Sequence, residues 1–193
     1  MKHFSRRCFL KDSMLATATA LAATTPAARI LAEEKQSKSP NEKLSVAVLG
    51  VRGRGAAHAT AFGSRDDCEI TYVCEPDSAI GPKRAEQIGQ RQGGRAPKCV
   101  TDMRDVFDDP SVDIVVVATP NHWHSLAAIW AMQAGKDVYV EKPVSHNVSE
   151  GRRMVQAMEK YNRICQGGTQ YRSVGSNRAA AEYIRSGKLG KIS

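Results

Sequence analysis

Two short apolar runs on either side of a helical segment constrain the fold of this chain most. Residues 114–117 (IVVV) and 138–140 (VYV) are β-type runs, and residues 126–132 between them place apolar side chains at helical spacing. The first run has no polar alternation, which is typical of a central parallel strand covered on both faces. The segment therefore predicts a strand, helix, strand unit of an α/β protein.

Polar side chains follow each of these two strands at the point where it ends. Thr119, Asn121 and His124 come after the first strand, and Glu141 and Lys142 come after the second. In an open parallel sheet the carboxyl ends of the strands lie at one edge, and ligands bind there. We therefore expect these five side chains to contribute to one site.

A glycine-rich turn, GVRGRG, follows an earlier β-branched run over residues 44–49 and opens an Ala-rich helical segment. Its glycines and arginines are Gly50, Arg52, Gly53, Arg54 and Gly55. The usual dinucleotide-binding pattern is G-x-G-x-x-G, and here Arg52 takes the place of the second glycine. We expect a shifted loop in which Gly53 supplies backbone freedom and the Arg52 guanidinium meets phosphate. A structural glycine turn is the alternative for this motif taken alone.

Residues 69–74 predict another strand, and this strand ends on Glu75. An acidic residue about 20 positions beyond the glycine turn is placed to accept hydrogen bonds from the adenosine ribose hydroxyls of a dinucleotide. Its charge repels a 2′-phosphate, so Glu75 favours NAD over NADP. Arg52 and Arg54 lie close enough in sequence to help bind a phosphate, and NADP therefore stays open as the alternative cofactor.

The N-terminal 32 residues predict a targeting signal rather than part of the fold. Residues 5–11 read SRRCFLK, and a mildly apolar Ala/Thr run follows over residues 14–23. This combination predicts a twin-arginine export signal over residues 1–32 and a periplasmic or extracytoplasmic location. A disordered basic arm is the alternative. We expect residues 33–43 to form a polar linker.

Composition argues against several other classes of protein. The net charge is +8, but five of the 28 basic and one of the 20 acidic residues lie in the first 32 positions, which leaves +4 for the remainder. That modest excess, with no basic helix carrying stacking aromatics, gives little support for a nucleic-acid partner. No apolar run reaches the ~18 residues of a membrane span. The five cysteines form no C-x-x-C pair or Cys/His cluster, so we expect no metal site.

The C-terminal part predicts further elements and a domain boundary. We expect Ser149 to N-cap a helix that ends at Tyr161. A strand is expected from residue 164 and a last helix over residues 175–186. These elements place a nucleotide-binding domain at residues 44–165 and the beginning of a truncated substrate domain at residues 166–193.

The sequence resembles the Gfo/Idh/MocA family, the group of glucose-fructose oxidoreductase and inositol dehydrogenase. The resemblance covers residues 44–193 and is carried by the glycine turn, ATPNHWH at 118–124, GKDVYVEKP at 135–143, GTQ with Arg172 at 168–172, and GKLGKI at 187–192. Thr-Pro-x-x-x-His joined to Glu-Lys-Pro at this spacing is specific. The resemblance implies an α/β fold with a Rossmann-type doubly wound parallel sheet, followed by only the start of a second, α+β substrate domain.

The resemblance also implies roles for individual residues. Thr119, Asn121 and His124 would lie along the nicotinamide half of the cofactor. Glu141 would lie at the nicotinamide ribose or amide, and Lys142 would be the catalytic lysine beside the reacting carbon. The alternatives are that His124 caps the following helix and that Lys142 is a surface lysine.

The implied function is an NAD(P)-dependent oxidoreductase that transfers hydride between a nicotinamide cofactor and a sugar, polyol or related hydroxy compound. Gln170 and Arg172 are candidates for contacts with that substrate, with a structural role as the alternative. Two other functions stay open, namely an NAD-dependent glycoside hydrolase that uses transient internal oxidation and a non-catalytic, truncated dinucleotide-binding module. Further acid/base residues of such relatives lie beyond the cofactor domain. We therefore expect that residues 1–193 alone do not form a complete active site. A homo-oligomer is compatible with the full-length form.

Overall fold

The computed structural model of the chain describes residues 43–191, so the expected export signal and nearly all of the expected linker lie outside the described residues. The strands are β1 (Leu44–Leu49), β2 (Cys68–Cys74), β3 (Lys98–Val100), β4 (Ile114–Val117), β5 (Asp137–Glu141) and β6 (Cys165–Gly168). The helices are α2 (Gly53–Gly63), α3 (Gly81–Arg91), α4 (Arg104–Phe107), η2 (Asn121–Trp123), α5 (His124–Gln133), α6 (Val148–Tyr161), η3 (Gln170–Ser173) and α7 (Gly175–Arg185). None of the helices in this described part is long and apolar enough to cross a membrane.

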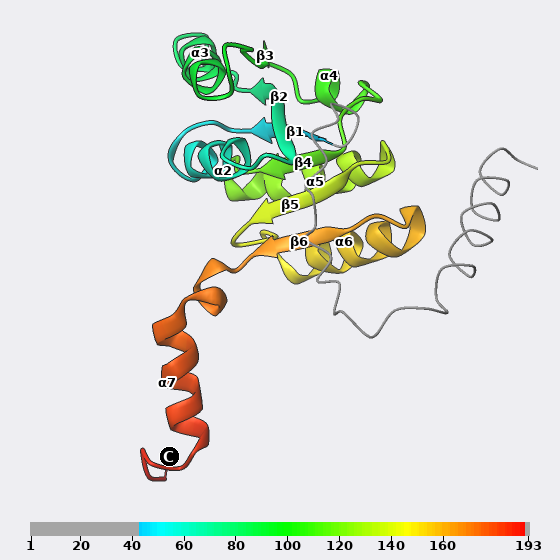
Figure 1. Cartoon of the computed structure of the whole chain (residues 1–193). Helices are drawn as coiled ribbons and strands as arrows, with labels where there is room; N and C mark the ends of the chain where they lie inside the picture. The colour runs from blue at the N-terminus through cyan, green and yellow to red at the C-terminus, as the bar shows by residue number, and fades with distance from the viewer. Residues whose placement is uncertain (1–42, 192–193) are drawn as a thin grey trace, which may run out of the picture. The chain divides into compact units, whose positions relative to one another are not determined.

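The six strands form one parallel sheet in the order β3-β2-β1-β4-β5-β6 (Figure 1). Within the described residues the chain runs from β1 in the middle of the sheet outward to β3, returns to β4 beside β1 and runs outward again to β6. This is the doubly wound order of a Rossmann-type sheet, so the predicted fold class is confirmed. The strand order reverses between β1 and β4, and the crevice beyond their carboxyl ends is where such sheets bind ligands.

Alternate residues of the central strands pack into two separate cores, one on each face of the sheet. Val46 and Val48 of β1 pack with the residues that α2 and α3 bury. Ala47 and Leu49 pack with the residues that α5 and α6 bury. All four side chains are fully buried, which removes apolar surface from water on both faces and explains why this strand has no polar alternation.

The start of one helix differs from the sequence prediction. The N-cap of α6 is Asn147, whose side-chain oxygen accepts a hydrogen bond from the Glu150 N–H at 2.9 Å. The prediction that Ser149 caps this helix is therefore wrong, because Ser149 lies inside the first turn. Strand β6 pairs with β5 as far as Gly168, and the boundary between a nucleotide-binding and a substrate domain stays a prediction.

Candidate functional site

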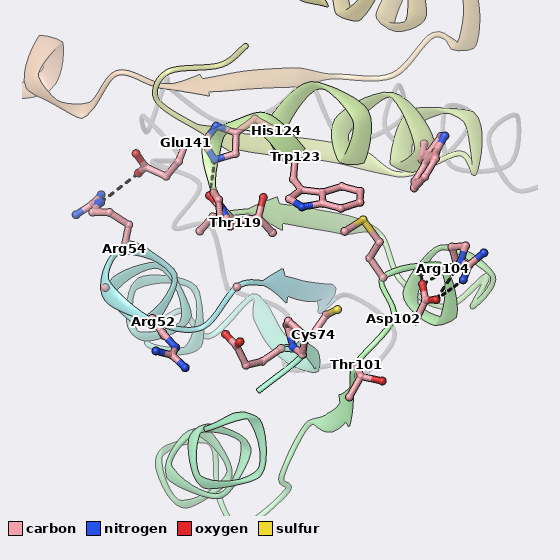
Figure 2. A pocket seen from close by; sticks show the side chains of 18 of the residues that line it. Arg52, Arg54, Cys74, Thr101, Asp102, Arg104, Thr119, Trp123, His124 and Glu141 are labelled. Atoms are coloured by element: carbon pink, nitrogen blue, oxygen red, sulfur yellow. Dashed lines mark hydrogen bonds and ion pairs between the residues drawn. The ribbon is translucent and has the colours of Figure 1, made fainter. Parts of the chain in front are cut away.

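A cavity of about 800 Å³ lies at the carboxyl edge of the sheet (Figure 2). The segments that follow β1, β2, β3, β4 and β5 all line it, because parallel strands bring their carboxyl ends to the same edge. The predicted site residues that line it are Gly50, Arg52, Gly53, Arg54, Glu75, Thr119, His124, Glu141 and Lys142. A cavity of this size is typical of sites for cofactors and other small molecules.

The glycine turn lets the loop after β1 approach the loop after β4. Gly50 has a φ of +78°, and a Cβ there would lie 2.8 Å from the Ala118 carbonyl oxygen. A Cβ at Gly55 would lie only 1.7 Å from the Gly50 carbonyl oxygen. Gly53 has a φ of +40° and begins α2, whose N-terminal amides can face an anion. Gly55 therefore packs behind the turn, whereas Gly50 and Gly53 line the cavity.

Glu75 holds its carboxylate beside the glycine turn. The residue is only 8% exposed and lines the cavity. Its Oε2 accepts a hydrogen bond from the Val51 N–H (3.3 Å), and its Oε1 accepts one from the Asp77 N–H (3.2 Å). These two backbone donors fix the carboxylate at the tip of β2, the position that contacts adenosine ribose in dinucleotide-binding sheets.

Each arginine of the glycine turn is paired with a different carboxylate. Arg52 forms an ion pair with Asp77, in the segment after β2. Arg54 donates from Nε to Glu141 Oε1 at 3.2 Å, at the end of β5 (Figure 2). Because β2 and β5 lie on opposite sides of the central strands, the two guanidinium groups extend toward opposite ends of the cavity.

Glu141 also binds His58, which the sequence did not single out, and the backbone of Lys142. Its Oε1 accepts a hydrogen bond from His58 Nε2 at 2.7 Å, and its Oε2 accepts one from the Lys142 N–H at 3.1 Å. Burial by itself raises the pKa of Glu141, but the hydrogen bonds from His58, Arg54 and the Lys142 backbone outweigh it and bring the pKa below its usual range. Glu141 is therefore ionised, and its carboxylate links α2 to the backbone of Lys142.

His58 was missed because its partner lies 83 positions away in the sequence. It lies on α2, is buried, and packs edge-on against Tyr139 with ring centroids 5.0 Å apart. The signal that could have found it is a histidine on the apolar, inward face of the helix that follows the glycine turn. A histidine buried there needs a polar partner.

Lys142 and Thr119 both have polar groups without a partner in the described part of the chain. The Lys142 side chain is exposed and lines the cavity, and its Nζ makes no hydrogen bond or ion pair within residues 43–191. The Thr119 Oγ1 is buried and also lacks a hydrogen-bond partner among those residues. A buried hydroxyl without a partner costs about 1–3 kcal/mol, so Thr119 fits a site that a polar ligand completes.

His124 connects the segments after β4 and β5. Its ring is buried, with Nδ1 2.7 Å from the Pro143 carbonyl oxygen and Nε2 2.8 Å from the Thr119 carbonyl oxygen. The ring makes no capping hydrogen bond at the start of α5, where the N-cap residue is Trp123. The structure therefore places His124 as a brace between two loops of the cavity wall (Figure 2).

Four of the predicted residues do not line the cavity: Gly55, which packs behind the turn, and Asn121, Gln170 and Arg172. Asn121 is exposed in η2, and Arg172 is exposed in η3. Gln170, with its amide oxygen turned toward Arg54, accepts a hydrogen bond from Nη2 at 3.3 Å. Gln170 therefore contacts the Arg54–Glu141 pair rather than the cavity itself.

The structure adds residues to the cavity wall that the sequence motifs did not indicate. Met103 and Arg104 come from the segment after β3, Trp123 from η2 and Trp130 from α5. Trp123 could have been found as an aromatic residue inside the strand-end motif, whereas Trp130 is indistinguishable from a core residue of its helix. Within residues 43–191, no group of three or more His, Cys, Asp or Glu side chains is arranged to hold a metal ion.

Comparison with known proteins identifies the family. The sequence profile of a family described as "Oxidoreductase family, NAD-binding Rossmann fold" matches residues 44–169, well over half of the chain. The chain belongs to the Gfo/Idh/MocA family. This Gfo/Idh/MocA protein accordingly has an NAD-binding Rossmann domain, and the predicted cofactor NAD is confirmed.

Relatives of this Gfo/Idh/MocA protein include enzymes with different names. It is 32% identical over 178 residues to "Glycosyl hydrolase family 109 protein 2" of Shewanella sp. (strain ANA-3), a match that covers 86% of this chain and 39% of that protein. The structure of levoglucosan dehydrogenase in complex with NADH has a TM-score of 0.66, 27% identity and coverage of 78% of this chain and 41% of that one. Myo-inositol 2-dehydrogenase from Lactobacillus plantarum has a TM-score of 0.67, 26% identity and coverage of 78% and 43%. The chain thus spans about two fifths of the length of these proteins.

The residues around the cavity fit NAD. Gly50 and Gly55 let the turn pack tightly against its own backbone and the loop after β4, and this places the N-terminus of α2, which begins at Gly53, at the cavity where it can face a pyrophosphate. Glu75 presents a fixed acceptor for ribose hydroxyls, and the Thr119 hydroxyl lacks a partner within the described residues. These features lie around one cavity and match the two halves of a dinucleotide.

Proposed function

We propose that this chain is the cofactor-binding part of an NAD-dependent oxidoreductase that acts on a sugar, a polyol or a related hydroxy compound. The observation that carries the proposal is the position of Lys142, whose Nζ has no partner within residues 43–191 and lines the same cavity as Glu75 and the glycine turn. A free ammonium group beside a dinucleotide site is suited to act on a substrate hydroxyl. The names of the levoglucosan and myo-inositol dehydrogenases support the substrate class.

The chain's own residues would divide the binding of NAD between two ends of the cavity. Glu75 accepts hydrogen bonds from the adenosine ribose, and the N-terminal amides of α2 face the pyrophosphate. Thr119 offers its hydroxyl to the nicotinamide half. NAD, when bound, supplies the acceptor for hydride, and the protein supplies position and electrostatic field.

Lys142 is the residue that we propose to act on the substrate. Its ammonium group can donate a hydrogen bond to a substrate hydroxyl and stabilise the negative charge that develops on that oxygen during oxidation. Glu141 holds the backbone of Lys142 through Oε2, which fixes the point from which the lysine side chain extends. We also propose that Asn121 contacts the nicotinamide half of NAD and that Gln170 and Arg172 contact the substrate. None of the three lines the cavity itself.

The test combines a binding measurement with a turnover measurement on the full-length protein. Calorimetric titration with NAD⁺ is expected to show binding to the wild type and to Lys142→Met alike, because Lys142 is assigned to the substrate. NADH formation from a panel of polyols and anhydrosugars is expected with the wild type and to fall at least 100-fold with Lys142→Met. Absence of NAD⁺ binding, or unchanged turnover by the variant, contradicts the proposal.

A glycosidase that oxidises its substrate only transiently is the competing activity, because the family 109 glycosyl hydrolases are among the relatives. Such an enzyme releases nitrophenol from a nitrophenyl hexoside or N-acetylhexosaminide without net formation of NADH. The oxidoreductase is expected to form NADH and to release no nitrophenol. One assay with both readouts therefore separates the two activities.

The proposal includes export by the twin-arginine route. It is supported by the SRRCFLK string at residues 5–11 and the Ala/Thr run that follows it. A fusion of residues 1–43 to a reporter that is active only after folding in the cytoplasm is expected to reach the periplasm. Replacement of Arg6 and Arg7 by lysine is expected to retain the reporter in the cytoplasm, and continued export by that variant contradicts the assignment.

A further inference from the structure

Basic side chains that line the cavity are paired with carboxylates, with one exception. Arg52 pairs with Asp77, Arg54 pairs with Glu141, and Arg104 donates from Nε to both oxygens of Asp102 at 3.0 Å. Lys142, at the opposite end from Glu75, is the lining residue whose charge has no such partner within residues 43–191. An anionic group that enters beside Glu75 therefore meets arginines that are already neutralised.

Asp77 is held in place by its own turn, which fixes the direction of its carboxylate. Its Oδ1 accepts a hydrogen bond from the Ala79 N–H at 2.9 Å, and its N–H donates to Glu75 Oε1 at 3.2 Å. Its carbonyl oxygen accepts from the Ile80 N–H at 3.0 Å, where α3 begins. With Oδ1 occupied by the turn, Oδ2 is left to bind Arg52.

Glu75, Asp77 and Arg52 consequently carry a net negative charge together, next to the expected position of the adenosine ribose. Glu75 and Asp77 contribute two carboxylates, and Arg52 contributes one guanidinium. The 2′-phosphate that distinguishes NADP from NAD adds up to two further negative charges at this ribose. Arginine is the side chain best suited to bind such a phosphate, so the engagement of Arg52 matters for the choice of cofactor.

We propose that Asp77 is a specificity-determining residue that withholds Arg52 from the 2′-phosphate of NADP. Glu75 favours NAD because its carboxylate repels the 2′-phosphate of NADP. Asp77 favours NAD because it binds the Arg52 guanidinium, which would otherwise offset that repulsion. The inference rests on the proposed function, since it assumes that the cavity binds the dinucleotide with adenosine at Glu75. The Arg52 and Asp77 side chains are 60% and 39% exposed, so the pair is screened by water and its effect is moderate.

Asp77→Asn tests the proposal without removing the turn, because asparagine retains Oδ1 for the Ala79 N–H. The dissociation constants of NAD⁺ and NADP⁺ are measured by calorimetry at low ionic strength. The preference for NAD⁺ over NADP⁺ is expected to fall about fivefold, the order of effect of one charge pair near a protein surface. NAD⁺ affinity is expected to change by less than about twofold.

Two further variants make the result specific to the Arg52–Asp77 pair. In the Arg52→Ala background, Asp77→Asn is expected to lose most of its effect on the preference. Asp67→Asn is the matched control, because Asp67 forms a similar exposed pair with Arg65 (2.6 Å) but does not line the cavity. This control is expected to leave the preference unchanged.

Three results would overturn the inference. An unchanged preference in Asp77→Asn shows that Asp77 does not set it. An equal gain for NADP⁺ with and without Arg52 assigns the effect to the charge of Asp77 alone. A wild-type protein that binds neither cofactor overturns the proposed function and the inference with it, and the two failures are distinguishable because only this last one abolishes NAD⁺ binding.

Discussion

Gly55 is the residue whose replacement the glycine turn tolerates least. A Cβ at this position would lie 1.7 Å from the Gly50 carbonyl oxygen, which is backbone and cannot move aside cheaply. Gly55→Ala is expected to lower the free energy of unfolding by about 3 kcal/mol and to weaken NAD⁺ binding more than tenfold. Urea denaturation and calorimetry provide the two measurements.

The control for this variant lies at the end of the same helix. A Cβ at Gly63 would make an ordinary contact, 3.7 Å from Ile70 Cγ1. Gly63→Ala is therefore expected to change stability by less than about 0.5 kcal/mol and to leave NAD⁺ binding intact. If the two substitutions had equal effects on stability and NAD⁺ binding, the close approach of Gly55 to Gly50 would not be the reason that Gly55 is needed.

His58 provides a second prediction at the scale of single residues. His58→Leu removes the 2.7 Å bond to the buried Glu141 carboxylate, which keeps its bonds from Arg54 and the Lys142 N–H. We expect a loss of about 2 kcal/mol in the free energy of unfolding, as for a hydrogen bond to a charged group. His58→Gln, whose amide can donate to the same oxygen, is expected to recover most of that loss. Equal losses in both variants would rule out the hydrogen bond as the cause.

The sequence predicted the site best where backbone geometry decides the position of a residue. Thr119, Glu141 and Lys142 were predicted to share one edge because parallel strands end there, and all three line the cavity, as does Glu75 after β2. The partners of side chains were not predictable in the same way. The choice of Asp77 for Arg52, or of Glu141 for His58, depends on packing between segments far apart in the sequence.

Among the elements, the strands were easier to predict than the starts of the helices. Strand β4 matches its predicted range of 114–117, because an uninterrupted β-branched run leaves little choice. Helix α6 has three polar residues near its start, and Asn147, Ser149 and Glu150 each fit a capping pattern. Only the extended backbone at Asn147, with φ −148° and ψ 168°, decides among them.

The cap of α6 gives a prediction at this scale. Asn147→Ala removes the acceptor for the Glu150 N–H and is expected to lower the free energy of unfolding by about 1 kcal/mol. Ser149→Ala, at the second residue of the helix, is expected to change the free energy of unfolding by less than about 0.5 kcal/mol. Thermal unfolding of the two variants side by side checks the assignment. A larger loss of stability in Ser149→Ala than in Asn147→Ala would mean that Ser149 is the N-cap.

Acid stability is a property of the whole molecule to which Asp109 contributes. Its Oδ2 accepts a hydrogen bond from the Tyr72 hydroxyl at 2.7 Å and links β2 to the turn ahead of β4. The bonds from Tyr72 and Ser111 lower the pKa of Asp109 from 3.8 to about 2. A carboxyl with a lowered pKa stabilises the fold above pH 3.8, and this contribution is lost as the pH falls toward 2.

Asp109→Asn is therefore expected to make the unfolding free energy less dependent on pH between about 4 and 2. The difference amounts to at most about 1 kcal/mol, because the carboxylate is partly exposed to water. Denaturant unfolding at a series of pH values measures it. Parallel curves for wild type and variant across this range would exclude a contribution from Asp109.

The central position of β1 determines when this domain can fold during synthesis. Strand β1 is the first described strand to leave the ribosome, but Val46 pairs with Ile114 and Leu49 with Val117. One edge of β1 thus stays unpaired until residues 114–117 have been made, and such non-local parallel pairing is slow. Until then β1 can pair only with β2, and its other edge is open in the nascent chain. An unpaired strand edge is a template for pairing with other chains, so β4 closes the edge at which β1 could aggregate.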